Sequence, residues 1–188
     1  LDLPVDFDTL TEYGAMMGSG GMIVMDDRSC MVEVARYYVD FLCEESCGKC
    51  TPCREGTTRM NEILTRITQG NGRMSDLDEL KSLAKMIQVS SLCGLGKTAP
   101  NPVLSTLQNF EEEYIEHIRD KRCHCGTCKA LAQFVITDKC IGCTKCARNC
   151  PVNAITGTVR HKHVIDTTKC IKCGTCKANC PVGAIKEG

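Results

Sequence analysis

The sequence predicts an α+β protein in which a small four-helix bundle precedes a strand-poor, cysteine-rich domain. Two observations lead to this fold class. Apolar residues recur at helical spacing between residue 31 and about residue 120. Cysteines occupy 17 of the 188 positions, and one pattern of closely spaced cysteines occurs twice near the C-terminus. Hydrophobic residues make up 43% of the chain, enough for a core that is mainly aliphatic because the chain has no Trp.

Charge and cysteine usage exclude several classes of protein. Lys and Arg number 23 and so do Asp and Glu, so the chain lacks the strongly basic surface that nucleic-acid binding needs. No apolar run reaches the roughly 18 to 20 residues of a membrane span. An odd number of cysteines at short spacings fits metal or cluster ligation in a reducing compartment better than a disulfide scaffold. We therefore expect a cytoplasmic protein whose partners are proteins.

Residues 1–28 form a separate Gly- and Met-rich zone. The sequence begins with Leu1 rather than Met, so we expect a segment of a longer polypeptide. The run 18–27 predicts a loop followed by a short buried strand. Its glycines precede the strand instead of following one, which favours a tight turn over a nucleotide-binding loop.

Four amphipathic helices are predicted within residues 29–119. The fourth has Asn101 and Pro102 at its start and an apolar stripe that includes Phe110. Short connections between the helices favour a small bundle. The apolar stripes of the four helices begin and end at Val32 and Leu42, Met60 and Ile67, Leu77 and Ile87, and Val103 and Ile118.

The cysteine pattern of the C-terminal region is a repeat. Residues 140–155 align with residues 170–185, and ten of the 16 positions are identical. Each copy has the spacing C-x2-C-x2-C-x3-C-P, in which three thiolates bind one [4Fe-4S] cluster and the fourth binds the cluster of the other copy. We therefore predict a bacterial-type 2[4Fe-4S] ferredoxin-like domain over residues 134–188.

The crossed pattern assigns four cysteines to each cluster of this domain. A pair of zinc sites is the alternative, but it leaves the triple spacing unexplained. His161 and His163 alternate with basic residues between the copies, so we expect both to face solvent and neither to bind a metal. One cluster is assigned to Cys140, Cys143, Cys146 and Cys180, and the other to Cys170, Cys173, Cys176 and Cys150.

A third cluster site is predicted in the helical region. Cys47, Cys50 and Cys53 lie at the start of the second helix, where free backbone amides favour an anionic cluster. Cys93, in the loop after the third helix, supplies the remote fourth thiolate. A zinc site of four cysteines is the alternative on spacing alone.

These motifs resemble a known family. The run 45–56, together with Cys93, resembles the C-terminal cluster domain of the NADH-binding flavoprotein subunit of respiratory complex I, and so does the run 18–27. With its two-cluster tail, the chain is similar to the β subunits of multimeric NAD-linked [FeFe] hydrogenases, including electron-bifurcating ones. The resemblance implies that FMN and NAD(H) bind only in an upstream region. It also implies that residues 1–28 are the end of a ubiquitin-like (SLBB-type) domain.

Five cysteines remain, and three of them lie in a junction over residues 120–133. We predict a Cys3His zinc site at this junction. Free buried thiols and a fourth iron-sulfur cluster are the alternatives, while Cys43 is expected to be a core thiol. The resembled family tends to keep the histidine and the two outer cysteines of the junction. The preferred zinc ligands are His117, Cys123 and Cys128, with Cys125 or Cys30 as the fourth.

The predicted function is electron relay. Three [4Fe-4S] clusters would pass single electrons between an upstream flavin and partner clusters or soluble ferredoxin. The resemblance implies a hydrogenase catalytic subunit and a small [2Fe-2S] subunit as partners, in an anaerobic prokaryote. A component of an NAD-dependent formate dehydrogenase or another bifurcating enzyme is one alternative, and a zinc-stabilised module without redox chemistry is a second. No catalytic residue is expected because the segment has no paired nucleophile and base and no P-loop.

Overall fold

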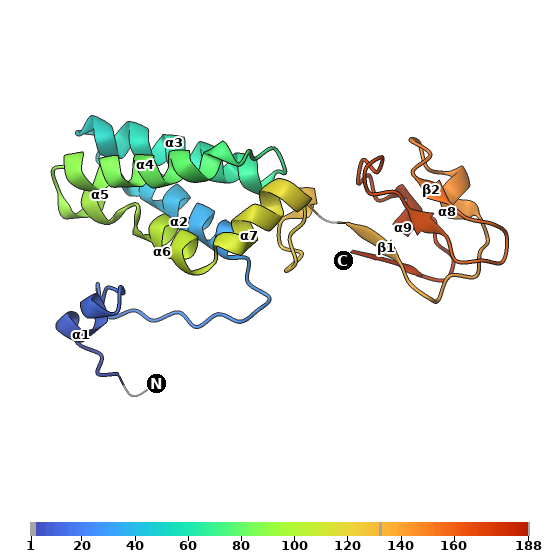
Figure 1. The fold of residues 1–188 in the computed structure, drawn as a ribbon, viewed down its shortest axis with the longest axis horizontal. Coiled ribbons are helices and arrows are strands. Elements are labelled where there is room, and N and C mark those ends of the chain that lie inside the picture. Colours follow the sequence, from blue (N-terminus) through green and yellow to red (C-terminus); the bar gives the residue numbers. More distant parts are fainter. Residues whose placement is uncertain (1–2, 132, 188) are drawn as a thin grey trace.

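A computed structural model describes residues 3–131 and 133–187, which form a helix-rich region followed by a small region with short strands (Figure 1). Among the helices of these residues, none is both long and apolar enough to cross a membrane. The helices are α1 (Phe7–Glu12), α2 (Met31–Glu45), α3 (Thr51–Thr68), α4 (Ser75–Ser90), α5 (Gly94–Thr98), α6 (Asn101–Asn109), α7 (Glu111–Ile115), a π-helix (Glu116–Asp120), a 3-10 turn (Lys129–Leu131), α8 (Lys145–Arg148) and α9 (Thr175–Ala178).

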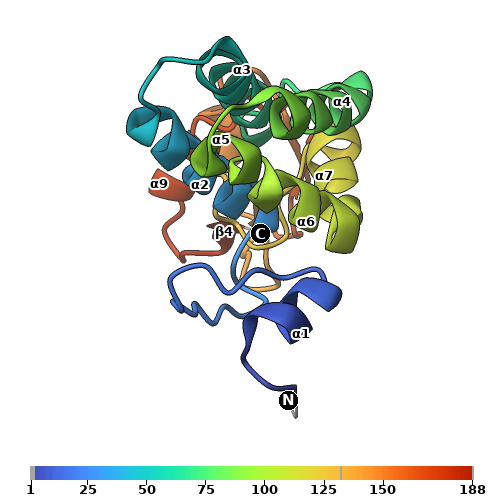
Figure 2. The same ribbon diagram turned by 90° about the vertical axis from the view of Figure 1, so that its left-hand side faces the viewer.

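The prediction of a short buried strand in the N-terminal segment is wrong. The run 18–27 forms no strand, and its apolar side chains are exposed, with Val24 at 83%. A strand needs a neighbour to complete its hydrogen bonds, and the strands in the described residues pair only with one another. Both views show α1 and the extended chain after it lying apart from the longer helices (Figures 1 and 2).

The helical core is built by apolar stripes at helical spacing. α2 packs against α3 and α6, and α3 packs against α4. Gly56 of α3 is required for this contact, because a Cβ there would lie 2.6 Å from the Ile87 side chain of α4. The fully buried core side chains of these helices include Val32, Val39, Met60, Ile63, Leu64, Ile67, Leu80, Ile87 and Val103.

The predicted fourth helix is divided into α6, α7 and the π-helix. The break lies at Phe110, whose φ of −138° and ψ of 34° are not helical. Phe110 is 44% exposed, so its assignment to the buried stripe was wrong. The break lets Tyr114 reach the core, where its hydroxyl lies 2.7 Å from Thr106 Oγ1.

The C-terminal region contains two small antiparallel sheets. β1 (Phe134–Ile136) pairs with β4 (Ile185–Glu187), and β2 (Ile155–Thr156) pairs with β3 (Val164–Ile165). Each sheet therefore joins a strand that precedes one cysteine-rich copy to a strand that follows one. Such pairing is the arrangement expected of two copies related by a pseudo-twofold axis.

Candidate metal centres

The eight cysteines of the repeat surround two cavities in the C-terminal region. The wall of each cavity contains three cysteines from one copy and one from the other. Mainly apolar side chains complete both walls, with Thr144 and His163 as polar members of the first and Thr175 of the second. Such a lining suits a group bound through thiolates. The first cavity contains Cys140, Cys143, Cys146 and Cys180, with Ile141 and Val182. The second contains Cys170, Cys173, Cys176 and Cys150, with Ile171 and Val152.

The loops of the two copies are shaped by residues with left-handed backbone angles. Thr144 and Gly174 precede α8 and α9 with φ values of 62° and 75°, which turns the loop into its short helix. Gly142 is needed for a second reason. A Cβ at this position would lie 2.4 Å from the His161 backbone nitrogen, so only glycine allows the first loop to meet the segment that connects the two copies.

Backbone amides point at the two cysteines that cross between the copies. The Ala154 amide donates to Cys150 Sγ at 3.3 Å, and the Ala184 amide donates to Cys180 Sγ at 3.2 Å. Amide donors of this kind stabilise a thiolate over a thiol. The equivalent contact in each copy shows that the duplication extends beyond the cysteine spacing.

His163 contradicts the prediction of an exposed histidine. Its side chain is 1% exposed and lies in the wall of the first cavity. Gly157 makes room for the ring, since a Cβ there would lie 2.6 Å from it. His163 Nδ1 lies 3.1 Å from the His161 carbonyl oxygen, while Nε2 is buried without a hydrogen-bond partner. His161, two residues earlier, is exposed as predicted. Strand alternation does not apply to these two residues, because β3 begins only at Val164.

The helical region brings together the chain segments that carry its four cluster cysteines. Cys50 and Cys93 immediately precede α3 and α5, where the first backbone amides of a helix have no helical partner. Backbone N–H groups of Leu92 and Cys53 lower the pKa of Cys50. The Cys93 loop therefore lies against the start of α3.

Close packing around the buried Cys53 depends on a glycine of α5. A Cβ on Gly96 would lie 2.7 Å from Ser91 Cβ and 3.3 Å from Cys53 Cβ. Ser46 Oγ lies 3.4 Å from Cys53 Sγ, and Arg54 Nη1 donates to the Gly48 carbonyl at 2.5 Å. Arg54 also forms an ion pair with Glu55 at 2.8 Å, so charged groups of both signs lie beside this site.

A compact Cys3His group lies at the junction of the N-terminal and C-terminal ends of the helical region. Its ligand atoms, all within 4.8 Å of one another, belong to Cys30, His117, Cys123 and Cys128, and all four residues are buried. His117 Nε2 lies 3.3 Å from Cys30 Sγ and 3.4 Å from Cys128 Sγ. These separations are short enough for one ion to contact every atom of the group.

Local structure positions two members of this group. Cys30 immediately precedes α2, and His117 lies on the π-helix, a form that often occurs at functional sites. His117 Nδ1 donates to the Glu113 carbonyl oxygen at 2.7 Å. This bond leaves Nε2 free to bind a metal, as in most metal-ligating histidines.

Hydrogen bonding distributes protons unevenly among the three thiols. Hydrogen bonds from the Cys128 and Cys30 thiols hold the pKa of Cys123 well below its usual range. The same contacts with Cys123 raise the pKa of Cys30 strongly and that of Cys128 to about 12. Burial lowers the pKa of His117, but hydrogen bonds with Cys123 and the Glu113 carbonyl outweigh it and leave the pKa raised. In the metal-free chain the group thus holds protons that a cation would displace.

Cys125 lies outside the Cys3His group. Its Sγ belongs to a second, less buried grouping with Glu113 and His124, and it donates to the Asp27 carbonyl at 3.5 Å. Burial is the main cause that raises its pKa to about 11. The fifth remaining thiol, Cys43, is half-buried and packs against the helical core.

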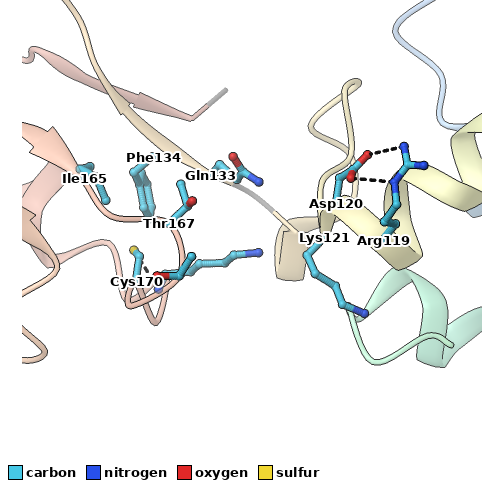
Figure 3. A pocket seen from close by; sticks show the side chains of 10 residues that line it. Arg119, Asp120, Lys121, Gln133, Phe134, Ile165, Thr167 and Cys170 are labelled. Carbon is cyan, nitrogen blue, oxygen red and sulfur yellow. Dashed lines mark hydrogen bonds and ion pairs between the residues drawn. The ribbon is translucent and has the colours of Figure 1, made fainter.

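A cleft of about 270 Å³ lies where the helical and C-terminal regions face each other. Figure 3 shows Arg119, Asp120 and Lys121 on one wall, with Phe134 and Cys170 on the other. Lys172 is bonded across this boundary through its ammonium group, which donates to the Ala130 carbonyl at 2.9 Å. One of the cysteines of the second cavity is therefore close to the end of the helical region.

Two family models match the chain. The NADH-ubiquinone oxidoreductase-F iron-sulfur binding region matches residues 33–117, and the 4Fe-4S dicluster domain matches residues 139–184. The first match covers the run 45–56 and Cys93, on which the predicted resemblance rests. The second match covers both copies of the cysteine repeat.

Proteins similar to this chain include HndC, a component of the NADP-reducing hydrogenase of Solidesulfovibrio fructosivorans. It is 51% identical over 87% of this chain and 34% of its own length. An F-type component of the NADH-quinone oxidoreductase of Rhizobium meliloti is 43% identical over 65% of this chain and 29% of its own length. A chain of an NAD+-reducing [NiFe]-hydrogenase in the H2-reduced state aligns with a TM-score of 0.49 and 31% identity, over 51% of this chain and 17% of its own.

The chain spans about a third of the length of the curated relatives that it matches. The predicted resemblance is confirmed by both family models and by the identity to these relatives. The chain is homologous to the C-terminal part of the F-type components of NADH-quinone oxidoreductase and of the HndC component of NADP-reducing hydrogenase, with an oxidoreductase-F iron-sulfur region followed by a 4Fe-4S dicluster domain.

Proposed function

We propose that this chain is an iron-sulfur electron-transfer segment of a multisubunit oxidoreductase linked to NAD(H) or NADP(H). The observation that carries the proposal is the pair of cavities in the C-terminal region, each with three cysteines from one copy and one from the other. Zinc would need a compact group of four ligands, whereas thiolates that bind different irons of a cubane lie farther apart. Among the described residues, only the Cys30 group and the Cys125 group bring three or more ligand atoms within 4.8 Å.

Each cavity would hold one [4Fe-4S] cluster, and the segment around α3 and α5 would hold a third. Cys47, Cys50, Cys53 and Cys93 are the ligands that we propose for the third cluster. Helices α2, α3, α4 and α6 would act as a four-helix bundle that carries this cluster at one end. Backbone amides at the starts of α3 and α5 would stabilise its negative charge.

A zinc ion would bind to Cys30, His117, Cys123 and Cys128. Three thiols and an imidazole whose second nitrogen is already bonded to a carbonyl are a donor set that fits tetrahedral Zn2+. All four positions would be filled by protein, so the ion would have a structural role. Zinc has no redox change and would carry no electrons.

The proposed partners follow from the named relatives. HndC is a component of an NADP-reducing hydrogenase, which favours a hydrogenase over a formate dehydrogenase as the assembly. The flavin and nucleotide sites would lie upstream of residue 1, outside this segment. Partner clusters of a hydrogenase catalytic subunit and a [2Fe-2S] subunit, or soluble ferredoxin, would exchange electrons with it.

We further propose that the assembly is of the electron-bifurcating type. A flavin hydroquinone releases two electrons one at a time. Clusters in two separate regions of this chain offer each electron its own route, one through the helical region and one through the C-terminal region.

Metal content and paramagnetic resonance of the full chain, reconstituted without oxygen, test the electron-transfer proposal. We expect a brown protein with about 12 iron, about 12 sulfide and about one zinc per chain. Reduction should produce signals of [4Fe-4S] clusters. A colourless protein that binds only zinc would contradict the proposal and support an interaction module without redox chemistry.

A further inference from the structure

Two of the four members of the Cys3His group are held through one residue outside it, Glu113 of α7. Cys30 and His117 are 87 positions apart in the chain, yet their ligand atoms lie 3.3 Å from each other. The carboxylate of Glu113 accepts from the Met31 amide at 2.9 Å. The carbonyl oxygen of the same residue accepts from His117 Nδ1 at 2.7 Å. One residue therefore contacts both of the segments that supply these two ligands.

The bond to Met31 restrains the backbone at Cys30. The Met31 amide belongs to the peptide group that joins Cys30 to α2, and the carbonyl of that peptide group accepts from the Val34 amide at 3.0 Å. The first amides of a helix have no helical partner, and the Cys30 side chain does not cap α2. Glu113, 82 positions away, takes the place of a capping side chain. The Cys30 thiol is thereby left to face the Cys3His group.

The position of Glu113 is itself fixed by the packing of α7. The next residue, Tyr114, is fully buried, and its hydroxyl lies 2.7 Å from Thr106 Oγ1 of α6. α7 also contacts α2 directly. The two bonds from Glu113 to the Cys3His group therefore start from a segment that the helical core already holds.

Glu113 is one of three successive glutamates with different surroundings. Glu111 forms an ion pair with Lys81 of α4 at 2.6 Å, and Glu112 is exposed. Glu113 is the partly buried member whose carboxylate bonds to the start of α2. The exposed neighbour thus provides a matched control of the same residue type on the same short helix.

We propose that Glu113 is a positioning residue for the zinc ion, and that its carboxylate holds Cys30 in place for binding. The inference rests on the proposed zinc site. Residues that orient metal ligands through hydrogen bonds contribute to metal affinity without touching the metal, and their loss typically weakens binding by about 10–100-fold. Without the carboxylate, the ion itself would have to order the start of α2, and the entropy lost in that ordering would weaken binding.

Zinc affinity of the full chain, reconstituted with its clusters in the absence of oxygen, tests this inference. Zinc is titrated against a competing chelator at one fixed pH, and iron and sulfide are measured on the same samples. Glu113→Ala removes the carboxylate and leaves the backbone carbonyl that orients His117. Glu113→Gln keeps an oxygen that accepts the Met31 amide but removes the charge. Glu112→Ala is the matched control.

We expect Glu113→Ala to bind zinc about 10–100-fold more weakly than the unchanged chain, with the same iron content. Glu113→Gln and Glu112→Ala should bind zinc like the unchanged chain. If Glu113→Ala fails to fold, Glu113→Asp decides. Its carboxylate is one carbon shorter and cannot reach the Met31 amide from the same backbone, so zinc binding should be weakened although the charge is kept.

Three results would overturn the inference. A helix cap without influence on zinc would destabilise the zinc-free and zinc-loaded chains equally, so Glu113→Ala would leave zinc affinity unchanged. Weak binding in Glu113→Gln would show that charge, not the hydrogen bond, is responsible. Cys125→Ser disrupts the less buried grouping of Cys125 with Glu113 and His124. Weak binding in that variant would show that Glu113 acts through this grouping.

The readouts separate this inference from the proposed zinc site. Zinc content of the unchanged chain reports whether the site exists. An unchanged chain that binds no zinc contradicts both the site and the role of Glu113. A chain that binds zinc with the same affinity before and after Glu113→Ala contradicts only the role of Glu113.

Discussion

The helical and C-terminal regions differ in what fills their cores. The helical core consists mainly of aliphatic side chains such as Leu64 and Leu80, with the Cys3His group at one edge. The C-terminal core has few buried apolar residues, and Cys146 and Cys176 are members of it. Cys140, Cys150 and Cys180 pack against the same core. The helical region thus buries enough apolar surface to hold its fold, whereas the C-terminal region depends on what its cysteines bind.

Removal of iron gives the largest expected contrast between the two regions. Without clusters, we expect residues 134–187 to lose protection from hydrogen exchange, because strands of two or three residues cannot hold a fold alone. Helices α2, α3 and α4 should remain protected. Exchange measured by mass spectrometry on iron-free, zinc-loaded chain checks this. Retained protection of β1 and β4 would show that the C-terminal core is sufficient without clusters.

The proposed zinc ion is expected to be lost when one of its four ligands is replaced. Cys30→Ser should abolish stoichiometric zinc, while Cys125→Ser, the matched control, should keep it because Cys125 lies outside the group. Zinc content and iron content are measured on the same samples, and iron should stay constant. Zinc affinity of the unchanged chain should fall as pH falls, since the raised pKa of Cys128, about 12, means that zinc must displace a proton. Equal zinc content in both variants would contradict the ligand set.

A cavity created in the helical core is expected to destabilise the helical region and leave the C-terminal region unchanged. Met60→Ala removes a fully buried side chain and should lower the free energy of unfolding of the helical region by about 2–5 kcal/mol. Met86→Ala, at a methionine that is 42% exposed, should have a much smaller effect. Denaturant unfolding followed by circular dichroism measures both. Cluster signals of the C-terminal region should be identical in the two variants, and a change in them would show that the regions are coupled.

The smallest expected effect comes from a single ion pair. Asp76 is almost fully buried and accepts from Arg66 Nη2 at 2.6 Å and from the Arg73 amide at 2.9 Å. Asp76→Asn should cost about 1.5–3 kcal/mol, the usual range for a hydrogen bond to a charged group. Urea unfolding at neutral pH measures the loss, and Asp78→Asn is the matched control on the same helix.

The same ion pair predicts a pH dependence. Burial raises the pKa of Asp76, but bonds from Arg66 and the Arg73 amide outweigh it, so the pKa lies below its ordinary value of 3.8. The stabilisation is therefore complete above about pH 3.8 and is lost as pH falls through the lower folded-state pKa. The difference in stability between the unchanged chain and Asp76→Asn should shrink in this acid window. A constant difference would contradict the ionised pair.

Cysteine spacing predicts which residues share a site because ligand geometry is local, and the ligand sets themselves stay predictions. The triple spacing places Cys140, Cys143 and Cys146 on one loop, and the remote Cys180 lines the same cavity. Most residues of the predicted apolar stripes are also buried in the structure. The choice between Cys30 and Cys125 was left open by the sequence, because it depends on how the ends of the helical region meet.

Other features depended on long-range packing that local patterns do not contain. The apolar run 18–27 reads as a strand, yet no described strand pairs with it. Phe110 fits a helical stripe that the backbone interrupts, because α6 ends one residue before it. His163 is hydrophilic and lies between the two copies, so the local pattern gives no sign that it lines a cavity.

The Cys3His group also determines where the chain enters and leaves the helical region. Cys30 and Cys128 are 98 positions apart, so one ion would close the helical region into a ring. The entropic cost of closing such a loop grows only slowly with its length, and a bound ion would keep both ends from fraying independently. The segments before residue 30 and after residue 128 would then both leave the ring at the bound ion. A force on either segment would reach the other across a few ångströms of metal and sulfur, without passing through the helices.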